Sequence, residues 1–198
     1  MLPREGVNSQ FGSPLASAPG FSTITGVRDR SMEPPAKIRR ATHQDTAEVS
    51  FILKEAARWL EESGMPLWRE GELEPANIAA DVAEGLFFVA ERLGNAVGVV
   101  RFQLEDAAFW PDVPQGEAAY IHRLAVRRRY AGTSLSTALL RWAVERTQSL
   151  GRRYLRLDCV ASRPRLRAVY ESFGFQHRDD KQVGPYFVSR YEYDVRAR

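Results

Sequence analysis

Strand-like and helix-like hydrophobic patterns alternate along residues 37–195, and this order limits the folds open to the chain. Apolar residues recur at helical spacing in 49–60, whereas 154–160 alternates with a period of two. The predicted strands cover 37–41, 86–91, 96–102, 120–126, 154–160, 175–179 and 186–195. The predicted helices begin after Thr42, at Pro75, near Leu135 and at Pro164. This order is typical of an α/β (α+β) domain, with a mixed sheet and helices on both faces.

Composition indicates one globular domain with an extension. The chain has 198 residues, of which 44% are hydrophobic and 27% charged, as in folded proteins. Residues 1–36 hold 5 of the 11 prolines and show no sustained periodicity. We therefore predict a flexible N-terminal extension over 1–36 and a single domain over 37–198. Translation starting at Met32 is the alternative explanation of that segment.

The net charge and the cysteine content limit the classes of partner and the cellular location that the sequence predicts. The net charge of +3 is compatible with a polyanionic small ligand. The sequence lacks an aromatic RNA-binding strand signature and a helix-turn-helix pattern, so we predict no nucleic-acid partner. No apolar run is long enough to span a bilayer, so no membrane partner is predicted either. A single cysteine, Cys159, excludes an intramolecular disulfide and favours a cytoplasmic location. The oligomeric state is open, and a homodimer is compatible with the sequence.

One segment has the pattern of a phosphate site. The predicted strand 120–126 is followed by three arginines, by small residues over 131–136 and by a helix. A helix start exposes unpaired N–H groups, and the helix dipole favours an anion there. The alternative is a solvated basic loop before an ordinary helix.

Two segments resemble a known family. The run 121–140 resembles the acetyl-CoA-binding motif of GNAT N-acetyltransferases, and 153–175, with its Tyr-Glu-x-x-Gly-Phe ending, resembles the family's next strand and helix. The resemblance implies the GNAT fold, a mixed and mostly antiparallel sheet of about seven strands. It also implies acetyl-CoA as the acyl-donor co-substrate. By resemblance the coenzyme-binding residues are Leu124, Ala125, Val126, Arg127, Arg128, Arg129, Ala131, Gly132, Thr133, Ser134, Leu135, Ser136 and Arg163.

Four of these positions depart from the family pattern. Ala131 replaces a side-chain donor, and Ser134 and Ser136 add bulk where glycine or alanine usually allows the backbone to approach phosphate. Arg163 stands where the family often has asparagine. These departures favour weakened coenzyme binding.

The resemblance assigns Tyr170 beside the sulfur of the coenzyme, where it would protonate the leaving thiolate. Tyr170 also shares a helix face with apolar residues, so a core role is the other interpretation. For the base, His122 is of a residue type that suits proton abstraction near neutral pH, and it lies on the strand that flanks the acceptor site in this family. Strict alternation would place it on the same face as Leu124 and Val126. Glu117, Tyr120, a water relay and a purely structural histidine are the alternatives.

Trp68, Phe109 and Trp110 lie in the two loops that border the acceptor pocket in this family, together with Asp106 and Asp112. Aromatic rings with carboxylates can hold a cationic amine, whereas loop packing is the structural alternative. His43, His177 and Cys159 show no ligand-like spacing, so we predict no metal site.

The sequence therefore predicts an N-acetyltransferase that transfers an acetyl or short acyl group from coenzyme A to the primary amine of a small molecule or peptide. A regulatory domain that binds acyl-CoA without turnover is the alternative.

Overall fold

The computed structural model describes residues 34–197, apart from the side chain of Glu70, so the predicted N-terminal extension lies outside the described residues up to position 33. The strands are β1 (Lys37–Arg40), β2 (Phe87–Arg92), β3 (Asn95–Gln103), β4 (Ala118–Val126), β5 (Tyr154–Val160), β6 (Gln176–Val183) and β7 (Tyr186–Asp194). The helices are α1 (Thr46–Glu62), α2 (Pro75–Ala83), α3 (Leu135–Ser149) and α4 (Pro164–Phe173), with short 3-10 helices η2 (His43–Asp45), η3 (Glu70–Leu73) and η4 (Arg128–Tyr130). The predicted order of strands and α-helices is confirmed.

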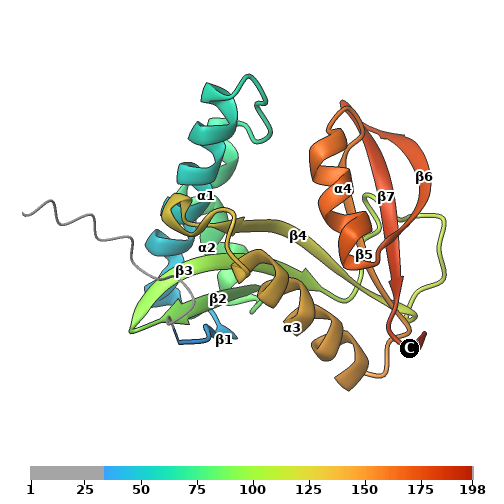
Figure 1. The fold of residues 1–198 in the computed structure, drawn as a ribbon, viewed down its shortest axis with the longest axis horizontal. Helices are drawn as coiled ribbons and strands as arrows, with labels where there is room; N and C mark the ends of the chain where they lie inside the picture. The colour runs from blue at the N-terminus through green and yellow to red at the C-terminus, as the bar shows by residue number, and fades with distance from the viewer. Residues whose placement is uncertain (1–33, 198) are drawn as a thin grey trace, which may run out of the picture. The chain divides into compact units, whose positions relative to one another are not determined.

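The strands form one sheet in the order β1-β2-β3-β4-β5-β7-β6 (Figure 1). Within the described part of the chain, β4 and β5 are the only parallel pair, and the other neighbours run antiparallel. The predicted class, a mixed and mostly antiparallel sheet, is therefore confirmed. The order in the sheet departs from the order in the chain only at the end, where β7 lies between β5 and β6.

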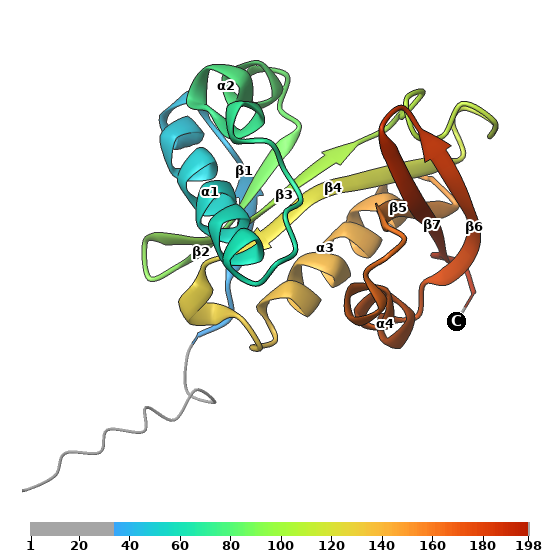
Figure 2. The same cartoon turned by 90° about the horizontal axis from the view of Figure 1, so that it is seen from above.

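Two helical layers cover the sheet (Figure 2). α1 and α2 pack on one face, where Ile52 and Ile78 join a core cluster with Val99 of β3. α3 and α4 pack on the other face in a separate cluster that includes the fully buried Leu139. The two faces of β4 therefore open toward different helices. Within residues 34–197, no helix is both long enough and apolar enough to cross a membrane.

Local sequence sets the ends of α4, the helix that carries Tyr170. Pro164 opens the helix, where its missing N–H costs nothing. Gly174 closes it with φ 116°, a left-handed conformation that favours glycine. A Cβ at this position would also lie 3.2 Å from the Tyr193 ring. The Gly-Phe ending thus turns the chain sharply into β6. Val169 of the same helix is 50% exposed.

Candidate active site

β4 and β5 pair over only part of their length. Their parallel register runs from Ala118 opposite Tyr154 to Ile121 opposite Leu157. Beyond that point β4 continues beside β3 and β5 continues beside β7. The edge of β4 from position 122 onward therefore has no strand partner on the β5 side among the described residues. Its backbone donors and acceptors are available to a ligand on that side.

A β-bulge lies at the start of this unpaired edge. Arg101 of β3 pairs with His122, and Val99 pairs with Ala125. Between these two pairs β4 has two residues, whereas β3 has one. Arg123 has φ 48°, a strained value for a residue with a side chain. A bulge of this kind changes which face the following residues occupy.

The bulge makes the predicted face of His122 wrong. Leu124 and Val126 pack with α3, in the same cluster as Ile121. Ala125 packs on the α1–α2 face. His122 lies on that second face, because its cross-strand neighbour Arg101 binds Asp81 of α2. Strict alternation fails because the extra residue at the bulge shifts the pleat by one position.

His122 lies between two carboxylates. Its Nε2 is 3.0 Å from Oδ2 of Asp106, which follows β3, and its Nδ1 is 3.6 Å from Oδ1 of Asp158 on β5. The side-chain amide of Gln103 is 3.3 Å from the same Nε2. Asp106 also accepts the backbone N–H of Phe109 at 3.2 Å, which fixes its orientation. Three separate elements thus hold the imidazole.

The Asp158 carboxylate is the poorly satisfied member of this group. Its Oδ1 is buried and has no hydrogen-bond partner within the described residues. Burial raises the pKa of Asp158 to about 6; the charge of Asp106 raises it further, and His122 opposes both effects. When Nε2–H donates to Asp106, Nδ1 and Oδ1 are both acceptors facing one position. A hydrogen-bond donor beside both atoms, such as an ammonium group, would satisfy them.

The alternative bases lie elsewhere. Glu117 precedes β4 at the paired end of the sheet and contacts Arg156 at 4.0 Å. The Tyr120 hydroxyl accepts a hydrogen bond from Arg156, and burial raises the pKa of that hydroxyl. Both groups belong to the end of β4 that pairs with β5. The structure thus brings His122 to the unpaired edge and leaves these two away from it.

Tyr170 reaches the region from the opposite face. Its ring packs against Phe175 and Tyr191, so the predicted apolar contacts are present. None of the hydrogen bonds within residues 34–197 engages its hydroxyl. Burial raises the pKa of Tyr170, and the neighbouring Cys159 and Asp158 raise it further. The phenol is therefore protonated at neutral pH and able to donate.

The predicted phosphate turn precedes α3. Gly132 has φ 74°, and Thr133 Oγ1 donates to the Tyr130 carbonyl oxygen at 2.6 Å. Ser134 is the residue that caps α3, yet its hydroxyl makes no capping hydrogen bond. The first-turn amides, including that of Ser136, lack intrahelical partners, as at any helix start. The Leu135 N–H already donates to Thr133 Oγ1 at 3.3 Å, so the donors that the turn offers are the other first-turn amides and the Ser134 hydroxyl.

Two of the three arginines before this turn are engaged by α1 instead. Arg127 pairs with Glu48 and lies over the Phe51 ring, 4.7 Å from its centroid. The Arg128 guanidinium lies over the Trp59 ring at 4.4 Å. Arg129 is exposed beside Tyr130. The side chains of Arg127 and Arg128 are therefore engaged with α1, and their contribution to a phosphate site stays a prediction. Their side chains tie the β4–α3 connection to α1.

Arg163 has a similar structural role. Its side chain is buried, and Nη2 donates to the carbonyl oxygens of Met65 and Pro66 at 2.8 and 2.6 Å. It thereby links the start of α4 to the segment after α1. These two hydrogen bonds use Nη2 alone, so the predicted role of Arg163 at the coenzyme stays a prediction beside this structural one.

The predicted aromatic residues of the acceptor pocket separate into three environments. The Phe109 ring lies 5.8 Å from the His122 ring and borders the site. Trp68 is partly buried against the α1–α2 core. Trp110 is 2% exposed and lies 4.6 Å from the Arg190 guanidinium. It cannot contact an acceptor in this structure, because the β3–β4 loop folds it inward.

Sequence reasoning missed Asp158 and Arg123 and did not pair Asp106 with His122. One signal was present for Asp158, since it lies on the polar face of a strand whose other face is apolar. The bulge had no such signal. Asp106, His122 and Asp158 also offer ligand atoms within 4.8 Å of one another, a geometry that could hold a metal ion. The prediction of no metal site stays a prediction.

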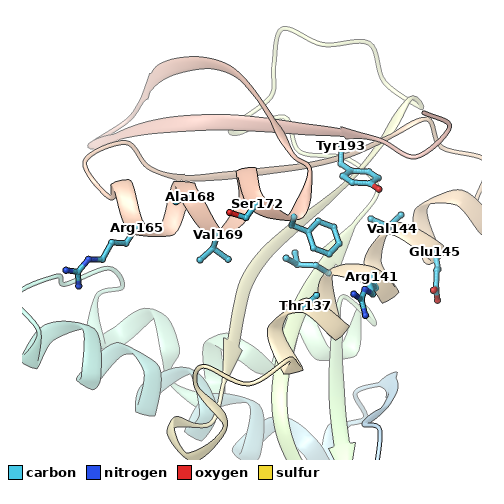
Figure 3. A pocket seen from close by; sticks show the side chains of 11 residues that line it. Thr137, Arg141, Val144, Glu145, Arg165, Ala168, Val169, Ser172 and Tyr193 are labelled. Atoms are coloured by element: carbon cyan, nitrogen blue, oxygen red, sulfur yellow. The ribbon is translucent and has the colours of Figure 1, made fainter. Parts of the chain in front are cut away.

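A groove of about 670 Å³ lies between α3 and α4. Figure 3 shows Thr137 and Arg141 of α3 on one side and Arg165 and Val169 of α4 on the other. The groove begins at the first turn of α3, beside the predicted phosphate turn. A ligand bound at that turn can therefore extend along it.

Comparison with known proteins places this geometry in a family. The family model described as Acetyltransferase (GNAT) family matches residues 52–175. The uncharacterized N-acetyltransferase YesJ of Bacillus subtilis (strain 168) is 32% identical over 143 residues, covering 69% of this chain and 79% of that protein. Among solved structures, a GNAT-family acetyltransferase from Listeria monocytogenes 4b F2365 is 25% identical, with a TM-score of 0.67 over 80% of this chain and 95% of that one. The PaiA N-acetyltransferase from Thermoplasma acidophilum, in complex with coenzyme A, shares the fold at 16% identity, with a TM-score of 0.64 over 81% of this chain and 100% of that one. The chain is therefore a member of the GNAT family of N-acetyltransferases.

Proposed function

We propose that this acetyltransferase transfers an acetyl or other short acyl group from acetyl-CoA to a primary amine by direct attack within a ternary complex. The observation that carries the proposal is the gap where β4 and β5 part. Tyr170 reaches it from the α3–α4 face, whereas His122 and Asp158 reach it from the α1–α2 face. A donor on one face and an acceptor on the other would meet there.

The α3–α4 face suits the coenzyme. The turn before α3 offers backbone and hydroxyl donors for the pyrophosphate. The unpaired edge of β4, at Leu124 and Val126, offers N–H and C=O groups that would pair with the amide-containing pantetheine arm. The groove beside α3, with Arg141 and Arg165, would take the nucleotide end. The coenzyme complex of the Thermoplasma relative supports a coenzyme in this fold.

The α1–α2 face suits the amine. His122 Nδ1 and the unpartnered Oδ1 of Asp158 would receive the ammonium group, and Asp106 would hold the ring through Nε2. His122 then takes the proton that must leave before attack. The neutral nitrogen attacks the thioester carbonyl, and the oxyanion is stabilised by the N–H of Val126. When the carbon–sulfur bond breaks, Tyr170 protonates the thiolate, and the second proton that the nitrogen loses restores the Tyr170 phenol through solvent, while His122 releases its own proton to water.

The arrangement around His122 suits a base held in a fixed orientation. Asp106 and Asp158 approach opposite nitrogens of the ring, which orients an imidazole through both of its nitrogens. The same carboxylate–histidine pairing also orients metal-bound imidazoles, so the effect of a chelator on turnover decides between a base and a metal ligand.

A second candidate is a regulatory acyl-CoA-binding domain without turnover. It is favoured by Ser134 and Ser136 at the turn and by the engagement of Arg127 and Arg128 with α1, since each weakens the phosphate site. A homodimer and a cytoplasmic location stay predictions for either function.

Thiol release separates the two candidates. The full chain is incubated with acetyl-CoA and a library of primary amines, and free thiol is followed together with the mass of the acylated amine. The proposed function predicts amine-dependent thiol release that Tyr170→Phe reduces. Acetyl-CoA binding in calorimetry without turnover of any amine would support the regulatory domain. Absence of binding would contradict both.

A further inference from the structure

The bulge of β4 directs Arg123 to the acceptor face. His122 and Arg123 are consecutive, yet the extra residue lets both project toward α2. Arg123 lines a cleft of about 630 Å³ with Arg69, Gly71, Glu72, Asn77 and Asp81, residues that come from η3, α2 and the segment before them. This cleft is separate from the groove between α3 and α4.

Arg123 is partly buried and has no bonded partner in the part of the chain that the structure describes. No ion pair, hydrogen bond or ring contact within the described residues engages its guanidinium. Burial lowers the pKa of Arg123, whereas Asp81 and Glu72 act in the opposite direction. Withdrawing a cation from water without a partner is unfavourable, so such a group is poised to gain from an anion.

The neighbouring Arg101 shows the contrast. It lies on the same face and binds both carboxylate oxygens of Asp81, at 2.8 and 3.0 Å. Asp81 is therefore already neutralised. Among the other charged lining residues whose side chains the structure describes, Arg69 and Arg123 are positive and Glu72 is negative. These described side chains leave one more positive than negative charge, which favours an anionic ligand.

The cleft is connected to the proposed base. Arg101 hydrogen-bonds Gln103, and the Gln103 amide lies 3.3 Å from His122 Nε2. An acceptor whose amine lies at His122 and Asp158 thus has Arg123 nearby on the same strand face. A guanidinium binds a carboxylate with two parallel hydrogen bonds, a geometry that also fixes orientation.

We propose that Arg123 binds the carboxylate of an amino-acid-like acceptor, in which the acylated amine lies a few bonds from a carboxylate. The inference rests on the proposed acetyl transfer and specifies its acceptor class. The positive charge of Arg123 binds the carboxylate, and the negative side chains near His122 bind the ammonium group. A simple alkylamine lacks the first interaction.

The test uses matched acceptors. The probes are the standard L-amino acids and the amines formed by removing their α-carboxyl group, such as phenylalanine with 2-phenylethylamine and leucine with 3-methylbutylamine. The wild type should accept at least one amino acid with kcat/KM at least about tenfold above its decarboxylated partner, the size of a lost charge-assisted interaction. Equal use of both partners throughout the panel would overturn the proposal.

Substitutions of Arg123 test whether this residue binds the carboxylate of the acceptor. Arg123→Gln should lower kcat/KM for the preferred amino acid at least about tenfold and leave the decarboxylated partner within about threefold. Arg123→Lys keeps the charge and should recover part of the loss. Arg58→Gln, an exposed arginine on α1, is the matched control and should behave as wild type. An equal loss for both partners in Arg123→Gln would show a structural role and contradict the proposal.

A measurement of acceptor binding tests the carboxylate site without relying on turnover. Calorimetric titration of the same probes into the coenzyme A complex should give a carboxylate-dependent affinity that Arg123→Gln removes. That result without thiol release would support the carboxylate site while contradicting acetyl transfer. Thiol release from decarboxylated amines alone would do the reverse. If Arg123→Gln does not fold, the wild-type preference between partners decides.

Discussion

Asp158 should reduce the stability of the fold while it serves the site. Its pKa is raised from 3.8 to about 6, mainly by burial. One pKa unit corresponds to about 1.4 kcal/mol, so the ionised carboxylate costs the folded protein about 3 kcal/mol at neutral pH. Asp158→Asn removes the charge at nearly constant shape. We expect the variant to be more stable than the wild type at pH 7 by up to about 3 kcal/mol, and less active.

The direction of the pKa shift determines how the free energy of unfolding should change with pH. A raised carboxyl pKa means that the folded state binds the proton more tightly than the unfolded state. The protonated group therefore contributes stability below about pH 4, and this contribution is lost as pH rises through about 6. The stability difference between Asp158→Asn and wild type should be near zero at pH 4, grow to pH 6 and stay constant above it.

Urea unfolding at several pH values measures this difference, with thiol release followed on the same samples. Asp45→Asn is the control of opposite sign, because Arg39 holds the pKa of Asp45 well below its usual range and the pair stabilises the folded state at neutral pH. The control should be less stable than the wild type at pH 7. The reasoning fails if Asp158→Asn is less stable at pH 7, or if its difference from wild type does not vary between pH 4 and 6.

Four further results are expected. Tyr170→Phe should lower turnover by roughly ten- to a thousandfold with unchanged acetyl-CoA affinity, and the loss should shrink for acyl donors whose thiol has a lower pKa; unchanged turnover would remove Tyr170 from the mechanism. Ser134→Gly should keep or tighten acetyl-CoA binding in calorimetry, and a clear weakening would make the hydroxyl a ligand. Arg163→Leu should lower the free energy of unfolding by about 1–3 kcal/mol, because two carbonyls lose their donor, whereas no change in urea unfolding would contradict that role. A chelator should leave thiol release unchanged, and loss of activity restored by a divalent metal would instead place an ion at Asp106, His122 and Asp158.

The elements of this fold could be predicted because their signals are local. Period-two alternation in 154–160 places Leu155 with the core and Asp158 on the other face, and both positions agree with the structure. Pro164 and Gly174 mark the ends of α4 through the conformations that these residues favour. Such preferences are properties of a few adjacent residues, so a sequence reveals them directly.

The arrangement of the site depends on contacts between distant residues. The bulge at Arg123 arises from pairing with β3, so strict alternation put His122 on the wrong face. Arg163 was expected at the coenzyme but binds carbonyls almost 100 positions earlier in the chain. Trp110 was expected at a pocket, yet Arg190 of β7 packs over it inside the protein. None of these partners is visible in the local sequence.

The central claim is that coenzyme and acceptor approach from opposite faces and meet where β4 and β5 part. A crystal structure of the chain with coenzyme A tests it most directly. The pantetheine arm is expected along the unpaired edge of β4 at Leu124 and Val126, with its sulfur beside the Tyr170 hydroxyl. Coenzyme bound elsewhere, with its sulfur away from Tyr170 and from the gap between the two strands, would contradict the account.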